Sequence, residues 1–321
     1  MLLSPQRLTD DIFLIDAYDL KRVGRTGSYV IKDDKITLIE TSASPSVPYI
    51  LEGLKQLNVN PEDISYIIVT HIHLDHAGGC GLLLDHCPNA KVIVHPKGAR
   101  HLIDPSKLIA GAKMVYGKEF EKLFSPIIPI QEGQIIVMHD KDTLNIGTRN
   151  LIFLDTPGHA NHHFSMYDPK SKGIFTGDTV GIFYHETQAD NIRLYLPSTS
   201  PNQFNPEVMM HSIDKLADLE PSRIYFGHFG MTEDVEETFS QVKSWIPKFV
   251  ETATSTLATC YDKPLSDQII AIKNQLLHTV KEYSEVGKLP QAHPIFEILS
   301  LDLQVCAMGL IDYLKKKEMQ A

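Results

Sequence analysis

The chain has 321 residues, of which 43% are hydrophobic and 22% are charged, a composition typical of a folded protein rather than of a disordered or fibrous chain. The formal net charge is −10 and the longest basic run is Lys315 to Lys317, which disfavours a nucleic-acid partner. The four cysteines lack CxxC spacing, the start of the chain lacks a basic segment followed by an apolar one, and no apolar run reaches the length of a membrane span, so a cytoplasmic protein is expected.

The first part of the chain alternates short apolar runs with turn signals. Strands are predicted at residues 12–15, 28–31 and 36–39, with the turn-forming Asp33 and Asp34 before the last of them. These runs predict an antiparallel meander. A helix is predicted over residues 47–57, and the apolar run 66–69 ends at Thr70, directly before the densest group of histidines.

Later strands are predicted at residues 92–94, 151–154, 164–167, 174–175 and 224–226. Residues 104–124 have a helical or irregular pattern, and this insert is expected to lie over the site. After Gly230 only helices are predicted, over residues 232–260 with a kink at Pro247, 266–283 and 295–317. The spacing of Ile269, Ile272, Leu276 and Tyr283 predicts one buried helix face.

Four side chains that bind metals occur within six residues, in the stretch His71-Ile72-His73-Leu74-Asp75-His76. Residues two apart in an extended segment point the same way, so His71 and His73 can reach one ion. The turn that follows allows Asp75 and His76 to face a second ion. Neutral imidazoles with a carboxylate suit zinc, and also iron, manganese or cobalt. The sequence therefore predicts a metal site on a loop between a strand and a helix.

Two ions need more than four protein ligands, and three further candidates follow glycines at predicted strand ends. His159 follows Gly158 after the strand 151–154, Asp178 follows Gly177 after 174–175, and His228 follows Gly227 after 224–226. Loops at strand ends are where a site is assembled on an α/β scaffold. These three residues are therefore the further candidate ligands.

The order of these motifs, His-x-His-x-Asp-His, Thr-Pro-Gly-His, Gly-Asp and Gly-His, resembles that of metallo-β-lactamase-fold hydrolases over about residues 10–230. The resemblance implies an α/β fold, a four-layer αββα sandwich with the site along one edge of two facing sheets. We expect a catalytic domain over residues 1–245 and a helical extension over 246–321. The resemblance also implies that His71, His73 and His159 hold one metal ion, that Asp75, His76 and His228 hold a second, and that Asp178 bridges them.

One position departs from the family pattern, which usually has Asp-Thr-Gly at the end of an early strand. This chain has Glu40-Thr41-Ser42 there. The carboxylate is kept but its side chain is one methylene longer. Its expected role is to hold a metal-bound histidine or the histidine-rich loop.

The resemblance implies two divalent metal ions per chain, with zinc expected and iron or manganese as alternatives. Hydroxide bridging the two ions would attack a small ester, lactone, thioester or phosphoester. Asp75 would orient the water or move its proton through its second oxygen. His163 stands at the second histidine of the family pattern TPGHxxGH and is expected to act near the metals or substrate, and Tyr184 is expected to reach the leaving group.

The substrate class stays open at this stage. The Gly-Cys-Gly-Arg-like segment of glyoxalase II-type thioesterases is absent after Asp178, and Gly181 stands where quorum-quenching lactonases often have a tyrosine. RNA-processing relatives usually add a basic exosite, and flavodiiron oxidoreductases have a glutamate where this chain has His73. The rival activity is that of a mononuclear iron dioxygenase resembling the persulfide dioxygenases. We expect a small-molecule substrate, no nucleic-acid or membrane partner, and a homodimer formed through the C-terminal helices.

Overall fold

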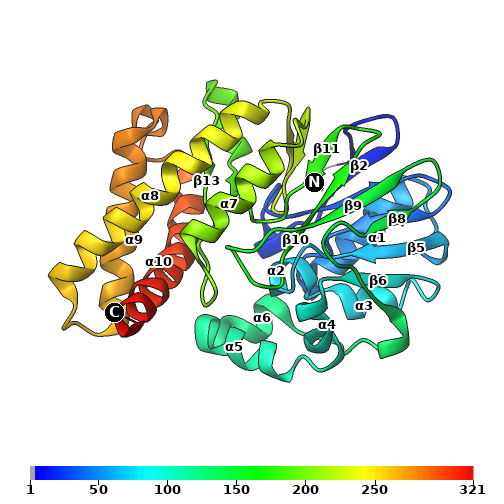
Figure 1. The fold of residues 1–321 in the computed structure, drawn as a ribbon, viewed down its shortest axis with the longest axis horizontal. Helices are drawn as coiled ribbons and strands as arrows, with labels where there is room; N and C mark the ends of the chain where they lie inside the picture. The colour runs from blue at the N-terminus through cyan, green and yellow to red at the C-terminus, as the bar shows by residue number, and fades with distance from the viewer. Residues whose placement is uncertain (1–3, 321) are drawn as a thin grey trace. The chain divides into compact units, whose positions relative to one another are not determined.

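The computed structural model describes residues 4–320, and these fall into two units (Figure 1). The first unit comprises the chain up to Asp155, together with His162–Gly177 and Pro221–Glu233. The second unit comprises Thr156–Asn161, Asp178–Glu220 and the chain from Asp234 onward. The first contains both large sheets, and the second contains the C-terminal helices.

A seven-stranded sheet forms the first layer of strands in the first unit. In sheet order its members are β1 (Gln6–Arg7), β2 (Ile12–Asp16), β3 (Gly27–Ile31), β4 (Ile36–Ile39), β5 (Ile64–Ile68), β6 (Lys91–Val94) and β7 (Ile135–Val137). The antiparallel pairing of β2, β3 and β4 confirms the predicted meander. The strands from β4 to β7 are parallel, so helices must connect them. These helices are α1 (Val47–Gln56), α2 (Leu74–Ala77), α3 (Cys80–Leu84), α4 (Pro96–Ile103), α5 (Ser106–Tyr116) and α6 (Phe120–Phe124).

The second sheet of this unit has six strands, in the order β15 (Met231–Thr232), β14 (Arg223–Tyr225), β11 (Gly173–Phe175), β10 (Phe164–Asp168), β9 (Asn150–Asp155) and β8 (Thr143–Asn145). The two-residue alternation of each strand divides its side chains between two cores. In β3, Tyr29 and Ile31 pack with residues of the second sheet, whereas Val30 packs with those of the helices. The first unit is therefore built of a helical layer and two facing sheets.

A buried arginine ties the turn between β8 and β9 to both sheets. The Arg149 guanidinium donates to Asp168 Oδ2 at 2.6 Å and to Asp33 Oδ2 at 3.2 Å, and it also contacts Asp11. Burial alone would raise the pKa of Asp33, but hydrogen bonds from Thr148, Asp34 and Arg149 lower this pKa to about 2. The carboxylate is therefore held in its charged form inside the fold.

The second unit is mainly helical. Its elements are the hairpin of β12 (Ile182–Phe183) and β13 (Tyr195–Leu196), followed by α7 (Pro206–Ala217), α8 (Val235–Cys260), α9 (Leu265–Tyr283) and α10 (Ile295–Gln320). Helices α8, α9 and α10, coloured yellow to red in Figure 1, pack on one another and confirm the predicted helical region at the end of the chain.

Two of the predictions for the helical region concern the course of α8 and the buried face of α9. Helix α8 continues through Pro247 as one element. It also runs across residue 245, where the catalytic domain is predicted to end and the helical extension to begin. This domain boundary stays a prediction. The buried face predicted for α9 is confirmed at Ile272 and Leu276, but it was wrong for Tyr283, which is 61% exposed. Tyr283 is the last residue of α9, where the helix ends and the pattern no longer applies. In the stretch 4–320, no helix is long and apolar enough to cross a membrane.

Candidate metal centre

The loop after β5 brings two imidazoles together in the first unit. His71 Nε2 and His73 Nδ1 lie 3.0 Å apart, and Thr70 Oγ1 lies within hydrogen-bond distance of His71 Nδ1, at 3.1 Å. His71 is buried and His73 is half-buried. Because a zinc–nitrogen bond is about 2.0–2.1 Å long, two nitrogens at this separation can bind one ion. Thr70 orients the His71 ring from its other side.

A second group of ligand atoms lies in the same unit, with Asp75, His76 and His228 as its members. Asp75 and His76 lie in the short helix α2, and His228 follows β14. His76 Nε2 is 3.8 Å and His228 Nε2 is 4.0 Å from Asp75 Oδ2. Ligand atoms about 4 Å apart can share one cation, since each metal–ligand bond spans about 2 Å. Two imidazoles and a carboxylate suit a divalent transition-metal ion.

Glu40 supports both parts of this arrangement from the end of β4. Its Oε1 accepts a hydrogen bond from the Thr70 backbone N–H at 3.2 Å, and its Oε2 lies 3.3 Å from His76 Nδ1. The side chain is only 2% exposed. A carboxylate behind the outer nitrogen of a ligand histidine fixes the ring and leaves Nε2 to face the metal. The predicted hold of Glu40 on the loop is confirmed by the hydrogen bond from Thr70, and the same carboxylate lies beside the His76 ring, whose role as a metal ligand stays a prediction.

His163 packs directly against His71, with ring centroids 5.0 Å apart and 30° between the planes. It is buried, as is Gly177, the residue at the end of the loop after β11. Gly177 has a φ of +49°, and a Cβ there would lie 2.4 Å from His163 Nε2 and 2.6 Å from Thr70 Oγ1. Only glycine fits this position, because it must adopt a left-handed backbone and leave room for two site residues.

The second unit holds the two remaining candidate ligands. His159 Nε2 lies 3.6 Å from Asp178 Oδ2, and both side chains are buried. The Ser198 carbonyl lies 2.9 Å from His159 Nδ1 and accepts a hydrogen bond from it, while the Ser198 hydroxyl donates to Asp178 Oδ2 at 3.0 Å. This pairing leaves Nε2 as the His159 nitrogen on the side of Asp178 Oδ2. One serine therefore orients two ligand-type side chains.

Tyr184, the other predicted catalytic residue, is only 2% exposed in the second unit. Its hydroxyl donates to Asp302 Oδ2 on α10 at 3.0 Å. Sequence reasoning did not single out Asp302 or Ser198. Asp302 lies 118 residues from Tyr184 and Ser198 lies 20 residues from Asp178, and neither has a motif around it that would have identified it.

Asp19 adds a buried carboxyl group to the first unit, on the loop between β2 and β3. Burial raises the pKa of Asp19 to about 6, Arg25 opposes the shift and Asp75 adds to it. Its neighbours Tyr18 and Leu20 both have left-handed backbone conformations, which few residues other than glycine adopt. This loop therefore brings a readily protonated group into the electrostatic field of Asp75.

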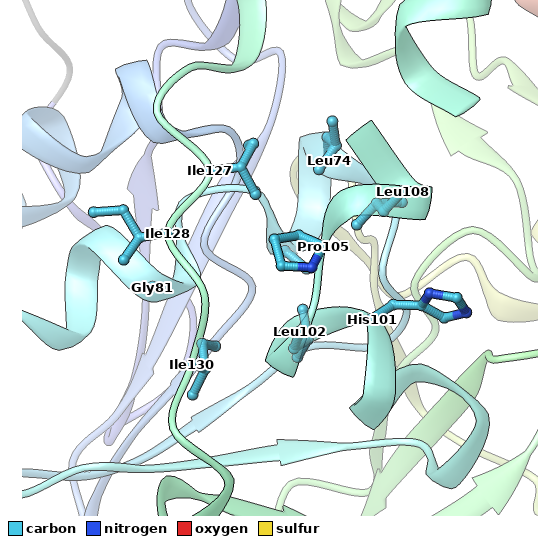
Figure 2. Close-up of a pocket in the computed structure, with 11 residues that line it drawn as sticks. Leu74, Gly81, His101, Leu102, Pro105, Leu108, Ile127, Ile128 and Ile130 are labelled. Atoms are coloured by element: carbon cyan, nitrogen blue, oxygen red, sulfur yellow. The ribbon is translucent and has the colours of Figure 1, made fainter. Parts of the chain in front are cut away.

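The insert predicted at residues 104–124 forms α5 and α6 and packs beside α2. Leu74 of α2 joins Phe120 and Phe124 in one apolar cluster. Figure 2 shows the small apolar pocket next to this cluster. The labelled residues around it are Leu74, Gly81, His101, Leu102, Pro105, Leu108, Ile127, Ile128 and Ile130. The insert thus supports the helix that carries Asp75 and His76.

Comparison with known proteins finds relatives that have the metallo-beta-lactamase fold or are named as probable metallo-hydrolases. The family model of the metallo-beta-lactamase superfamily matches residues 22–228. The metallo-beta-lactamase fold-containing protein ST1585 of Sulfurisphaera tokodaii is 26% identical over 188 residues, which cover 57% of this chain and 68% of that protein. The probable metallo-hydrolase YqjP of Bacillus subtilis is 24% identical over 236 residues, or 68% of this chain and 72% of that protein.

Solved structures show the same fold. The crystal structure of TTHA1429, a metallo-beta-lactamase family protein from Thermus thermophilus, aligns with a TM-score of 0.67 at 18% identity. The alignment covers 97% of this chain and 95% of that chain. The predicted α/β sandwich fold with a C-terminal helical region is confirmed.

Proposed function

Because the chain belongs to the metallo-β-lactamase superfamily, we propose that it is a hydrolase that uses two divalent metal ions to cleave a small ester, lactone, thioester or phosphoester. The observation that carries the proposal is the group of Asp75, His76 and His228, with Glu40 behind His76. Superfamily membership adds that most related proteins are metal-dependent hydrolases. Zinc is the proposed metal, with iron or manganese as alternatives.

We propose the ligand set that the motif order implies. His71, His73 and His159 hold one ion, Asp75, His76 and His228 hold the other, and Asp178 binds both. The support within the first unit is the 3.0 Å approach of His71 Nε2 to His73 Nδ1 and the grouping of Asp75 with two imidazoles. The support within the second unit is the orientation of His159 and Asp178 by Ser198.

A pair of divalent cations supplies Lewis acidity, which polarises the scissile group and lowers the pKa of water towards neutrality. The remaining roles fall to side chains of this chain. Asp75 is the most exposed of the candidate ligands in its group, at 28% for the side chain, and its carboxylate is proposed to accept the proton of the attacking water. Glu40 keeps His76 in one tautomer, and His163 fixes the plane of the His71 ring.

Tyr184 remains a proposed contact to the leaving group, and its hydroxyl is held by Asp302. The proposed partner is a small-molecule substrate.

A homodimer formed through the C-terminal helices also stays a proposal. Sedimentation at micromolar concentration tests it. A dimer is the expected result, and a monomer alone would contradict the proposal. The catalytic domain is proposed to cover residues 1–245 and the helical extension 246–321.

The decisive experiment combines metal analysis with a substrate panel. The purified protein is expected to contain two metal ions per chain and to hydrolyse at least one member of a panel of lactones, thioesters, phosphodiesters and phosphotriesters without consuming oxygen. The variants His71→Ala and Asp75→Asn should lose metal and activity together. His139→Ala changes an exposed histidine of the same unit and is the matched control, expected to retain both.

Two results would contradict the proposal in different ways. One iron per chain, with oxygen-dependent consumption of a persulfide, would assign the protein to the rival dioxygenase activity. Full metal content with no turnover of any panel member, and no effect of Asp75→Asn on any assay, would favour a metal-binding protein without hydrolase activity.

A further inference from the structure

One side of helix α10 contacts other parts of the second unit, and its middle meets the segment 197–202, which contains Ser198. The residues of this face are Asp302, Cys306, Gly309, Tyr313 and Lys316, spaced by three or four positions. This spacing places them along one side of a helix. Cys306, Gly309 and Lys316 contact the segment 197–202 itself, whereas Asp302 bonds to Tyr184 and Tyr313 bonds to Glu207.

We propose that α10 positions His159 and Asp178 by holding the segment 197–202 against them. The inference rests on the proposed function for the role of His159 and Asp178 as metal ligands. Its first step is the double contact of Ser198, whose carbonyl accepts from His159 and whose hydroxyl donates to Asp178. Ser200 adds a third contact, with its Oγ 3.3 Å from His159 Nε2. Any displacement of this segment therefore moves two ligands.

The second step is the close approach of the helix at Gly309. A Cβ at Gly309 would lie 1.8 Å from the Thr199 carbonyl oxygen and 2.6 Å from the Ser200 carbonyl carbon. Both are backbone atoms, so a larger residue would have to push the segment or the helix aside. Glycine is unfavourable inside a helix by about 1 kcal/mol relative to alanine. Its presence here is explained by the backbone contact and not by helix formation.

Hydrogen bonds fix the two elements on either side of Gly309. The Thr199 hydroxyl donates to the Cys306 carbonyl at 3.1 Å, and Lys316 Nζ donates to the Asn202 carbonyl at 2.5 Å. Asp302 accepts from Tyr184, which follows Asp178 by six residues. Burial raises the pKa of the Cys306 thiol to about 11, so this residue acts as a neutral packing group. Contacts before, at and after Gly309 therefore hold the segment along its whole length.

The test uses Gly309→Ala and Thr199→Val in the full chain. Hydrogen exchange at residues 197–202 should become at least tenfold faster in both variants. A zinc titration against a chelator should show at least a tenfold loss of affinity for one of the two ions. When Co²⁺ replaces zinc, the visible spectrum of the Co²⁺ ion at the weakened site should differ between each variant and the wild type. Thr199→Val replaces the hydroxyl with a methyl group of similar size, so it removes the hydrogen bond to Cys306 and remains informative if Gly309→Ala fails to fold.

Ser198 gives a second, more local variant. Ser198→Ala removes the hydroxyl bond to Asp178 and should weaken zinc binding by roughly 10- to 100-fold, as expected for a residue that orients a ligand. Ser198→Thr keeps the hydroxyl and should restore most of the affinity. A purely structural role of Ser198 would not give this rescue.

Gly111→Ala is the matched control, because Gly111 lies in α5 and a Cβ there meets nothing within 4 Å. It should leave both zinc affinities and the exchange of residues 197–202 unchanged. Wild-type exchange and wild-type zinc affinities in both Gly309→Ala and Thr199→Val would overturn the inference. If the wild-type protein binds neither zinc nor iron nor manganese, the proposed function fails, and the exchange of residues 197–202 alone decides whether α10 holds the segment.

Discussion

His76 turns its Nδ1 towards the Glu40 carboxylate, 3.3 Å away, and so leaves its Nε2 on the side of Asp75 and His228. Glu40 has a φ of +68°, and its other carboxylate oxygen receives the Thr70 backbone N–H, at the start of the histidine-rich loop. One carboxylate therefore contacts both the start of the histidine-rich loop and a candidate ligand histidine. This geometry explains how a glutamate can serve where the family usually has an aspartate.

The first prediction concerns the charge of Glu40. Glu40→Gln should lower metal affinity by about 10- to 100-fold, since a neutral amide stabilises the ligand histidine less than a carboxylate does. Glu40→Asp keeps the charge with a shorter reach and should lose less affinity. Competition with a chelator measures both. Glu62→Gln, at an exposed position, is the control. Equal affinity in Glu40→Gln and the wild type would remove Glu40 from the metal centre.

The second prediction separates two roles of Tyr184. Its hydroxyl is bonded to the buried Asp302, so Tyr184→Phe leaves a buried carboxylate short of one donor and should lower the free energy of unfolding by about 1–3 kcal/mol. Urea denaturation measures this loss. If Tyr184 also contacts the leaving group, kcat should fall for substrates with poor leaving groups while KM stays near the wild-type value. Unchanged kcat together with lower stability would limit Tyr184 to support of α10.

Local sequence patterns predicted the strands that appear in the sequence as apolar runs next to turn residues or ligand motifs. The short apolar run at residues 28–31, bounded by turn signals, identified β3, and the apolar run before Gly227-His228 identified β14. The short strands β1, β7, β8, β12, β13 and β15 were not predicted, because none of them forms an apolar run directly before a ligand motif, as the equally short β11 and β14 do. Pairing with neighbours, not local pattern, defines them.

The residues that orient the candidate ligands were mostly hidden in the sequence for a different reason. Ser198 acts through its backbone carbonyl as well as its hydroxyl, and a carbonyl leaves no mark in the sequence. Asp302 meets Tyr184 across 118 residues. His95 has no motif spacing, yet its Nε2 lies 2.6 Å from Asp155 Oδ1, at the ends of β6 and β9. The candidate ligands cluster in sequence motifs, whereas these polar contacts join residues that are far apart in the sequence.

The third prediction is a pH dependence of stability that involves Asp33. Its pKa is about 2 in the folded protein and close to 3.8 when unperturbed. Because the folded-state pKa is depressed, the stabilisation is fully present above pH 4 and is lost as the pH falls towards 2. A shift of this size corresponds to about 2 kcal/mol. Asp33→Asn should be less stable than the wild type at pH 7, and the difference should shrink below pH 4.

Urea denaturation of the metal-free protein in EDTA measures this effect without interference from metal release. Asp34→Asn is the control, because Asp34 is the exposed neighbour of Asp33. A stability difference between Asp33→Asn and the wild type that stays constant from pH 7 to pH 2 would show that Asp33 contributes by packing rather than through its charge.

The last prediction compares one substitution at two glycines of the first unit. Gly177 has a φ of +49°, and an added Cβ would come within 2.6 Å of His163 and Thr70 side-chain atoms. Gly177→Ala should therefore destabilise the fold by about 2 kcal/mol or more, through backbone strain and overpacking. Gly111 lies inside α5 with open space around it, and Gly111→Ala should stabilise by about 0.5–1 kcal/mol. Thermal unfolding of the metal-free variants measures both the loss of stability in Gly177→Ala and the gain in Gly111→Ala.

Gly177→Ala should also weaken metal binding, because His163 and Thr70 both contact the His71 ring. Gly177→Ala with wild-type stability and metal affinity would mean that the packing around His71 tolerates a methyl group, and the case for His163 as a support of that ligand would fail.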